Sequence, residues 1–390
     1  MQLHPQPRTH VVYTIVVIGF IYALHVAIPI YSNSSFLSLF ADSQIIGYIY
    51  MAGAALGIFG YLIAPSIIRR VGNYATSVWL VCIQIALLYG LISSTSPLVL
   101  ASLFILQTAI IPLIGLSLDI FLAVYTNGHK VGTIRGLYTS ITNSAWLIAP
   151  LLGSLLIGTT SNYRNTYVAA IAMLFPFLYL IHRNFPRFKD PHYTHPSPVQ
   201  LIKQISSNKN WVKLFVANTI LQTFYAWMVV YSPIYLHNTI GFEWTEIGII
   251  LTIMLLPFAL IQYPLGKIAD KKYGEKELMA IGFIIMAAAT AIIPLISEKS
   301  LLMWALILFV TRIGAAMTEI MIEIYFFKTV SSRDSAVLGS FRITRHVSYF
   351  IAPIITSVGL LFTTTPYLFT IVGAVTLLGL YPALTIKDTN

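Results

Sequence analysis

The sequence predicts an all-α membrane protein with twelve transmembrane helices in two pseudo-symmetric six-helix bundles. Three observations predict it: 57% of the 390 residues are hydrophobic, apolar runs recur along the whole chain, and the second half repeats the spacing of the first. The mean hydropathy of +0.80 lies well above that of an ordinary soluble domain. A membrane protein is therefore the starting expectation.

Each apolar run is close to the roughly 20 helical residues that cross a bilayer. The first run, VVYTIVVIGFIYALHVAIPIY, is too long for the core of a signal peptide and has no small-residue cleavage site after it, so we expect a retained helix. The twelve predicted spans are 11–31, 44–68, 75–93, 97–125, 133–159, 163–182, 210–236, 245–269, 276–297, 300–328, 335–362 and 366–386.

The distribution of charge explains the net charge of +10 without a nucleic-acid partner. Most of the 23 Lys and Arg residues fall in loops on the side of the N-terminus, whereas Arg164 and Lys299 fall on the opposite side. Cytoplasmic loops retain cations during insertion. We therefore predict a multi-pass protein of the plasma (inner) membrane with both termini in the cytoplasm. The single Cys82 excludes an internal disulfide and a cysteine-rich metal site.

One long connection divides the predicted helices into two sets of six. It is basic and proline-rich, HRNFPRFKDPHYTHPSPVQLIKQISSNKN, and its PVQLIKQI stretch predicts a short amphipathic helix on the cytoplasmic surface. The predicted parts are an N-terminal bundle at 1–182, a cytoplasmic linker at 183–209 and a C-terminal bundle at 210–390.

The two halves resemble each other at a nearly constant offset. RRVG, which ends at Gly72, answers KKYG, which ends at Gly274. Small residues at helical spacing let two backbones approach closely, and a proline loosens a helix where it bends. The small residues and the proline of the fifth span recur 203 residues later in the eleventh: Gly136, Ala145, Ala149 and Pro150 answer Gly339, Ser348, Ala352 and Pro353. A duplicated twelve-helix protein follows.

Two such halves around a central cavity form one large transporter class. The loop GKIADKKYGEK resembles the short signature that the major facilitator superfamily carries between helices 2 and 3 and again between helices 8 and 9, with one additional residue before Gly274. The first-half copy, APSIIRRVGNY, keeps Arg69, Arg70 and Gly72 but has Ile68 in place of the aspartate. Over essentially its whole length the chain resembles this superfamily.

Two stretches resemble the drug-proton exporters of the superfamily in particular. The fifth span, GLYTSITNSAWLIAPLLGS, is similar to their antiporter signature, with Ala145, Ala149 and Ser154 in place of glycines, and YALHVAIPIY in the first span is similar to the same exporters. The resemblance implies transport by alternating access and favours proton-coupled export. Recurrence of the spacing in the eleventh span leaves a close-packing role open, and a metabolite importer or facilitator is the alternative.

In the superfamily, the signature loop latches the two halves together. We expect Asp270 to face the start of the fifth helix near Arg135, because unpaired amides at a helix N-terminus favour a carboxylate. Asp119 and Glu323 occupy equivalent positions in the repeat, so we predict that each pairs with the basic loop of its own half. The alternative is that these charges only anchor the topology. The predicted gating residues are Arg69, Arg70, Asp119, Arg135, Gly266, Asp270, Lys271, Lys272, Gly274, Glu323 and Arg342.

Glu319 is a carboxylate that one half has and the other lacks, because its counterpart is Gly115. An ionisable group in the membrane persists when it is paired or useful. We predict that Glu319 carries the transported proton beside Arg345 and His346 of the next helix. A static salt bridge between Glu319 and Arg345 remains open as the alternative.

Helices 1, 4, 7 and 10 line the cavity in the superfamily, and Arg312 opens the stretch RIGAA, which resembles an arginine-glycine signature usually found in helix 4. We expect Arg312 to contact an anionic group of the substrate or carbonyl oxygens. Helix packing is the alternative role for each polar candidate taken alone. The predicted substrate residues are His25, Gln107, Asn143, Asn218, Gln222, Tyr225, Arg312 and Tyr349.

No stretch has the spacing of a metal-ligand pair, a nucleophile elbow or a phosphate loop. We therefore expect a protein that is not an enzyme and binds no cofactor or metal, and a membrane enzyme or sensor on the same scaffold is the alternative from another class. The expected partners are a small-molecule substrate, protons and the lipid bilayer, and we expect a monomer.

Overall fold

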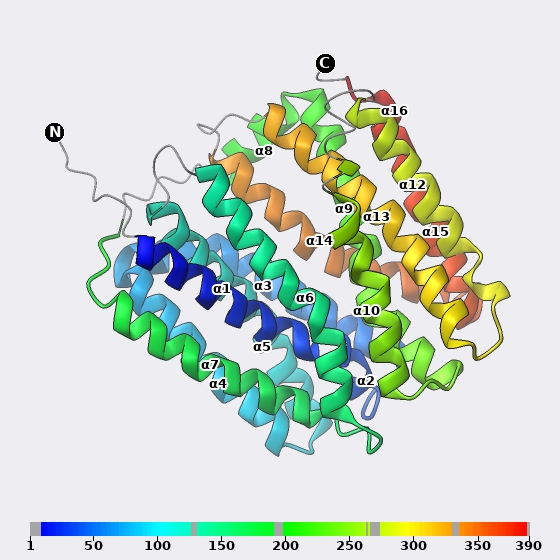
Figure 1. Cartoon of the computed structure of the whole chain (residues 1–390), viewed down its shortest axis with the longest axis horizontal. Coiled ribbons are helices and arrows are strands. Elements are labelled where there is room, and N and C mark those ends of the chain that lie inside the picture. Colours follow the sequence, from blue (N-terminus) through cyan, green and yellow to red (C-terminus); the bar gives the residue numbers. More distant parts are fainter. Residues whose placement is uncertain are drawn as a thin grey trace. The chain divides into compact units, whose positions relative to one another are not determined.

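The structure is a computed structural model whose regular elements, in the residues it describes, are all helices (Figure 1). Internal contacts divide the chain into unit 1, Met1–Ala41 with Ala52–Thr194, and unit 2, Asp42–Met51 with His195–Asn390. The described residues are 9–125, 131–190, 198–262, 264–265, 274–329 and 335–387.

Unit 1 is built from helices that pack side by side. Helix α1 packs against α6 and α7, and α4 packs against α5 and α7. The helices are α1 (Thr9–Ile30), α2 (Asn33–Leu37), α3 (Ser43–Val71, in this unit from Ala52 on), α4 (Asn73–Ser93), α5 (Pro97–Tyr125), α6 (Val131–Ile157) and α7 (Arg164–Asn184).

Small residues bring α1 and α6 together in the core of unit 1. Ala27 of α1 and Ala145 and Ala149 of α6 are fully buried in one cluster. A Cβ at Gly153 would lie 2.7 Å from the carbonyl oxygen of Ile28, so the two backbones approach too closely there for any side chain. The alanines that stand in place of the exporter glycines therefore make a helix-packing contact, which was one of the two roles expected of them.

Unit 2 repeats the pattern with the chain from the linker onward. Its helices are α8 (Pro198–Ser206), α9 (Lys209–Ile234), α10 (Trp244–Leu260), α12 (Glu275–Ala291), α13 (Leu301–Thr329), α14 (Ser335–Gly359), α15 (Leu368–Leu377) and α16 (Leu380–Thr385). A π turn at Tyr235–Thr239 follows α9, a short turn at Ile293–Leu295 follows α12, and another at Thr365–Tyr367 precedes α15. Helix α8 coincides with the predicted amphipathic stretch.

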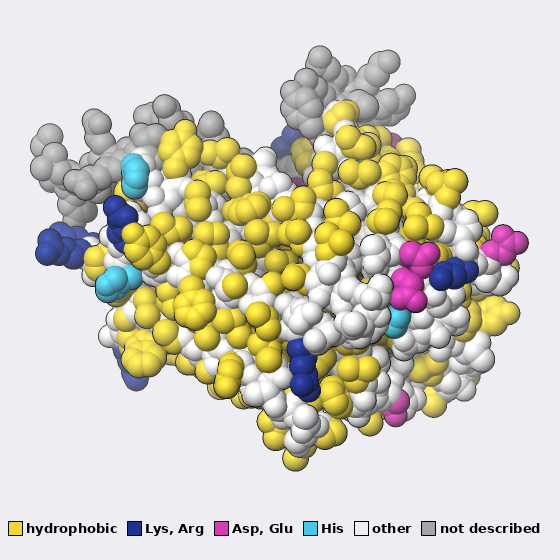
Figure 2. Space-filling view, turned by 60° about the horizontal axis from the view of Figure 1, so that its bottom comes forward, with side chains coloured by type: hydrophobic (Ala, Val, Ile, Leu, Met, Phe, Trp, Pro, Cys, Tyr) yellow, Lys and Arg dark blue, Asp and Glu magenta, His cyan; other side chains and the backbone are white. Residues whose placement is uncertain are grey.

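The predicted fold class is confirmed. Within the described ranges, ten helical segments are long and apolar enough to cross a membrane, and α10 is a shorter apolar helix. Helix α14 supplies the eleventh predicted span, with two arginines in its sequence, and the last span is interrupted between α15 and α16. Much of the face drawn in Figure 2 is covered by hydrophobic side chains with few charged ones among them, which suits contact with lipid tails.

The beginning of the predicted linker packs into unit 1. The Phe185 and Phe121 ring centres lie 4.7 Å apart, and the Asn73 amide donates a 2.9 Å hydrogen bond to Asp190 Oδ1. Gly72 turns the chain into α4 with φ of +89°, a conformation that favours glycine. Asp190 thus caps α4 in the half whose signature has Ile68 in place of an aspartate. The boundary at residue 182 remains a prediction.

Helices α12 and α13 cross with their backbones in contact. A Cβ at Gly282 would lie 2.8 Å from the Gly314 carbonyl oxygen and 2.9 Å from the Thr318 amide nitrogen, and it would also clash with Thr318 Oγ1. Gly314 is the glycine of the RIGAA stretch, and it meets the carbonyl of Gly282 in the same way. The two glycines therefore fix how closely α13, which carries Arg312 and Glu319, approaches α12.

We expect Gly282→Ala to destabilise the protein by about 1–3 kcal/mol, because the added methyl group forces two backbones apart. Thermal unfolding of the purified protein in detergent, followed by the exposure of buried tryptophans such as Trp227 and Trp304, measures the loss. Thr318→Ala in the same chain should restore little of it, since backbone atoms remain in the way. Full recovery in the double variant would contradict the backbone explanation.

Candidate functional site

Arg312 is buried in α13, with 2% of its surface exposed. Its guanidinium carbon lies 5.0 Å from the ring centre of Phe224 and 5.5 Å from that of Tyr225, both in α9. Aromatic faces attract a cation by roughly 0.5–2 kcal/mol, more when water is excluded. The structure thus brings together Arg312 and Tyr225, two of the residues predicted to bind substrate.

Small residues let α9 approach α13 at this level. Ala315 and Ala316, which follow Arg312 in the RIGAA stretch, are fully buried. Tyr225 Oη donates a long hydrogen bond of 3.4 Å to the Ala315 carbonyl, and its ring meets Phe258 of α10 edge to face, 6.0 Å between centres. Packing on α10 and α13 therefore orients the Tyr225 ring.

Glu319 lies about two helical turns beyond Arg312 in α13, on the same side of the helix. Its Oε2 accepts a 3.0 Å hydrogen bond from Gln262 Nε2, and Glu323, Arg345 and Arg312 are the charged groups that act on it electrostatically. Arg345, a predicted neighbour, is among them. Glu319 therefore stands in a mixed cluster of acids and arginines within unit 2.

The sequence prediction missed Gln262. This residue follows the last turn of α10 in the apolar stretch PFALIQYPLG. A lone amide within a predicted membrane span is a signal that was available, because a buried amide needs a partner. Only the folded arrangement of α10 against α13 shows that the partner is Glu319.

Helices α9 and α14 are joined by polar contacts. Asn218 Nδ2 donates to Thr344 Oγ1 at 2.8 Å, and Ser348 Oγ donates to the Thr219 carbonyl at 3.0 Å. Asn218 is 4% exposed, so in this structure it serves helix packing, the alternative role considered for it. Beside these contacts, Arg345 is exposed and the two predicted residues His346 and Gln222 are half-buried.

In unit 1, His25 and Gln107 are joined by Gln84 of α4. Gln84 Nε2 lies 3.4 Å from His25 Nε2 and 3.3 Å from Gln107 Oε1, and His25 Nδ1 lies 3.2 Å from the Ala170 carbonyl. These contacts fit a neutral imidazole that donates from Nδ1 and accepts at Nε2. All three side chains are buried, and Gln84 is a member that the sequence prediction missed. Any role of His25 and Gln107 in substrate binding stays a prediction.

The remaining two substrate candidates lie in different surroundings. Asn143 of α6 is exposed. Tyr349 of α14 is half-buried and stacks on Tyr50, also of unit 2, with ring centres 6.1 Å apart and an interplanar angle of 18°. Their predicted contact with substrate stays a prediction.

The predicted gating residues are described in part. Arg69 and Arg70 are exposed at the end of α3, Asp119 is half-buried in α5, Glu323 is exposed, and Gly274 caps the start of α12. Their proposed pairings stay predictions. The others lie outside the description, either as whole residues or as side chains: Gly266, Asp270, Lys271, Lys272, Arg135 and Arg342.

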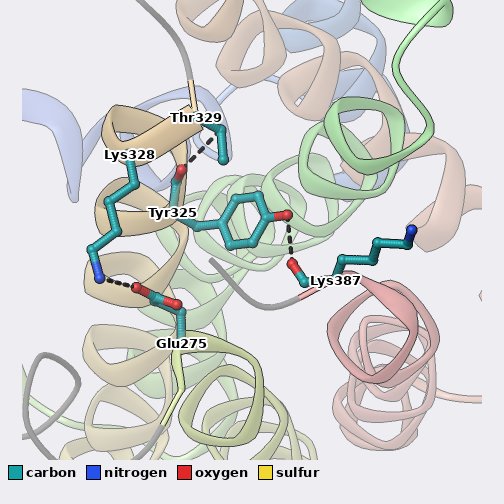
Figure 3. Close-up of polar contacts among 5 residues, drawn as sticks. All are labelled: Glu275, Tyr325, Lys328, Thr329 and Lys387. Carbon is teal, nitrogen blue, oxygen red and sulfur yellow. Dashed lines mark hydrogen bonds and ion pairs between the residues drawn. The ribbon is translucent and has the colours of Figure 1, made fainter. Parts of the chain in front are cut away.

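An ion pair joins the start of α12 to the end of α13. Its acid, Glu275, is also part of the signature stretch GKIADKKYGEK. Lys328 Nζ lies 2.6 Å from Glu275 Oε1, and Figure 3 shows the two side chains pointing toward each other. Glu275 is fully buried, whereas about a third of the Lys328 side chain is exposed (34%). A carboxylate in the first turn is also favoured by the helix dipole. The pair therefore ties α13 to the helix that it crosses at Gly282.

We expect Lys328→Met to destabilise the protein by about 1–3 kcal/mol, because a buried carboxylate loses the nearby ammonium. The double variant Glu275→Gln/Lys328→Met should be more stable than Lys328→Met, since the remaining amide carries no charge. Thermal unfolding of the wild type, both single variants and the double variant measures the coupling. Strictly additive effects would show that the pair contributes nothing.

Comparison with known proteins agrees with this architecture. A family model described as Major Facilitator Superfamily matches residues 229–389. A crystal structure of a mutant of the nucleoside transporter NupG is similar to this chain with a TM-score of 0.77, at 14% sequence identity, over 96% of this chain and 99% of that one. No curated protein matches the chain in sequence.

The protein therefore has the major facilitator fold of membrane transporters. The family model covers less than half of the chain, and the matched residues all lie in unit 2. Together with the structural likeness, this match supports the superfamily resemblance. Neither comparison confirms the closer likeness to drug-proton antiporters.

Proposed function

We propose that this integral membrane protein is a secondary transporter that moves a small organic solute by alternating access and exports it in exchange for protons. The proposal rests on Glu319, an acid that only one half of the chain has. Its Oε2 accepts a hydrogen bond from Gln262, and the charges of Arg312 and Arg345 act on it. Such a carboxylate either binds a proton or pairs with a nearby cation, and the two states differ by one unit of charge. Proton binding can therefore be coupled to the conformational change of the transporter.

Arg312 and Tyr225 are the proposed solute-binding pair. A guanidinium held over two rings keeps its N–H donors in a plane, which suits a carboxylate, a phosphate or a pair of carbonyl oxygens. The aromatic faces beside it suit a planar, partly apolar solute. We therefore propose a substrate that combines an acceptor or anionic group with an aromatic or apolar body.

Direction and orientation rest on the sequence. The excess of Lys and Arg in the loops on the N-terminal side supports a plasma (inner) membrane protein with both termini in the cytoplasm. The resemblance of the first and fifth spans to exporters supports export. The similar structure at 14% identity carries over only a fold, so nucleosides enter as one class of probe among several. Import or facilitated diffusion remains the alternative outcome of the assay.

A thermal-shift screen of nucleosides, aromatic carboxylates and organic cations selects the solute for proteoliposome assays. We expect Glu319→Gln to lower uptake driven by a pH gradient at least about tenfold, a difference of about 1.4 kcal/mol, because an amide of the same shape binds no proton. Counterflow of the same solute, which needs no gradient, should continue.

The matched control is Glu298→Gln, the same change at an exposed acid between α12 and α13, and it should transport as the wild type does. Proton coupling that survives in Glu319→Gln would remove Glu319 from its role. If transport by the wild type does not depend on the pH gradient, the result would favour facilitated diffusion.

For Arg312, we expect the solute KM to rise in the order wild type, Arg312→Lys, Arg312→Gln. Lysine keeps the charge but loses the planar donors and the stacking on Tyr225, and glutamine loses the charge as well. An increase of about tenfold per step corresponds to about 1.4 kcal/mol. Equal KM values in folded variants, measured by initial rates of counterflow, would show that Arg312 does not contact the solute.

A further inference from the structure

The chain that follows the last helix is bonded to the ends of two other helices of unit 2. The Lys387 amide donates to Asn210 Oδ1 in the first turn of α9 at 3.3 Å, and the Lys387 carbonyl accepts from Tyr325 Oη in the last turn but one of α13 at 2.7 Å. Figure 3 shows Tyr325 pointing at this carbonyl while the Lys387 side chain extends away from it. One peptide segment therefore bridges α9 and α13.

Two neighbouring contacts fix this segment in place. Lys213 Nζ of α9 donates to the Thr385 carbonyl at the end of α16, where a helix has unpaired carbonyls and favours a cation. Ile386, between Thr385 and Lys387, is 3% exposed. The segment is held by its backbone and by one buried apolar side chain, and it needs nothing from the charge of Lys387.

The distance from the bridge to the Arg312–Tyr225 contact is about the same along α9 as along α13. Along α9, Tyr225 is 15 residues beyond Asn210, about 22 Å. Along α13, Tyr325 is 13 residues beyond Arg312, about 20 Å. Helices α9 and α13 are thus joined at two levels, so a change in their spacing at the bridge changes the angle at which Tyr225 meets Arg312.

We propose that Tyr325 and Asn210 are positioning residues: with the backbone of Thr385–Lys387 they form a C-terminal clip that sets the spacing of α9 and α13, and through it the Arg312–Tyr225 contact. The clip itself is a property of unit 2 alone. Its effect on transport rests on the proposed function of Arg312 and Tyr225.

Distances between spin labels test the clip without any solute. Nitroxides attached to cysteines at Val212 of α9 and Thr329 of α13, in a Cys82→Ser chain reconstituted in liposomes, report the spacing by pulsed electron paramagnetic resonance. We expect one narrow distribution in the parent and a broader, longer one in Tyr325→Phe and in Asn210→Ala. Lys387→Ala, which keeps the backbone, should match the parent.

Asn210→Asp supplies the rescue, because a carboxylate oxygen accepts the same amide hydrogen and suits the first turn of a helix. Its distribution should return to that of the parent. Unchanged distances in Tyr325→Phe and Asn210→Ala, or equal broadening in Lys387→Ala, would overturn the clip. If Tyr325→Phe does not fold, the comparison of Asn210→Ala with Asn210→Asp carries the test.

Initial rates of solute counterflow separate the clip from the proposed function. We expect the KM of the solute chosen by the screen to rise several-fold in Tyr325→Phe and Asn210→Ala and to recover in Asn210→Asp. Changed distances with an unchanged KM would keep the clip and overturn its link to the Arg312–Tyr225 contact. A wild type that transports nothing, with the same label distances, would overturn only the proposed function.

Discussion

The hydrocarbon core of a bilayer offers no water to a polar group, so most polar groups there are satisfied within the protein. Backbone groups do so by forming helices. Side chains do so across helix contacts, and the partners they choose decide which helices stay together. Asn218 with Thr344 joins α9 to α14. Gln262, just after α10, bonds to Glu319 of α13. Gln84 joins α1 to α5 through His25 and Gln107.

The two units meet this requirement with different chemistry. The buried polar cluster of unit 1, His25 with Gln84 and Gln107, is built from side chains that are neutral as bonded there, whereas the cluster of unit 2 contains Arg312 and Glu319. A neutral cluster holds helices at little electrostatic cost, while a charged one responds to a proton or an ionic solute. This difference makes unit 2 the better candidate for the proposed proton coupling.

The fold could be predicted from apolar length, the basic loops and the repeat. The first two follow directly from the bilayer, and the repeated spacing predicts two bundles of similar build. Individual polar side chains were harder to place. Glu319 and Arg312 were recognisable because a charge in a membrane span is costly, but Gln262 and Gln84 carry no charge and are conspicuous only once their partners are known. The contact of Arg312 with Phe224 depends on helix rotation, which apolar periodicity leaves loosely defined in a helix that is buried on most sides.

Asp190 bears on how duplicated halves are compared. Unit 1 has Ile68 at the position where the signature has an acid, and the Asn73 amide at the start of α4 donates to Asp190, which lies more than a hundred residues further along the chain. A main-chain amide at the start of a helix needs an acceptor, and a residue distant in the sequence can supply it. An alignment of the two halves, column by column, scores this position as lost. A comparison of main-chain hydrogen bonds also records the acceptor that Asp190 supplies to α4.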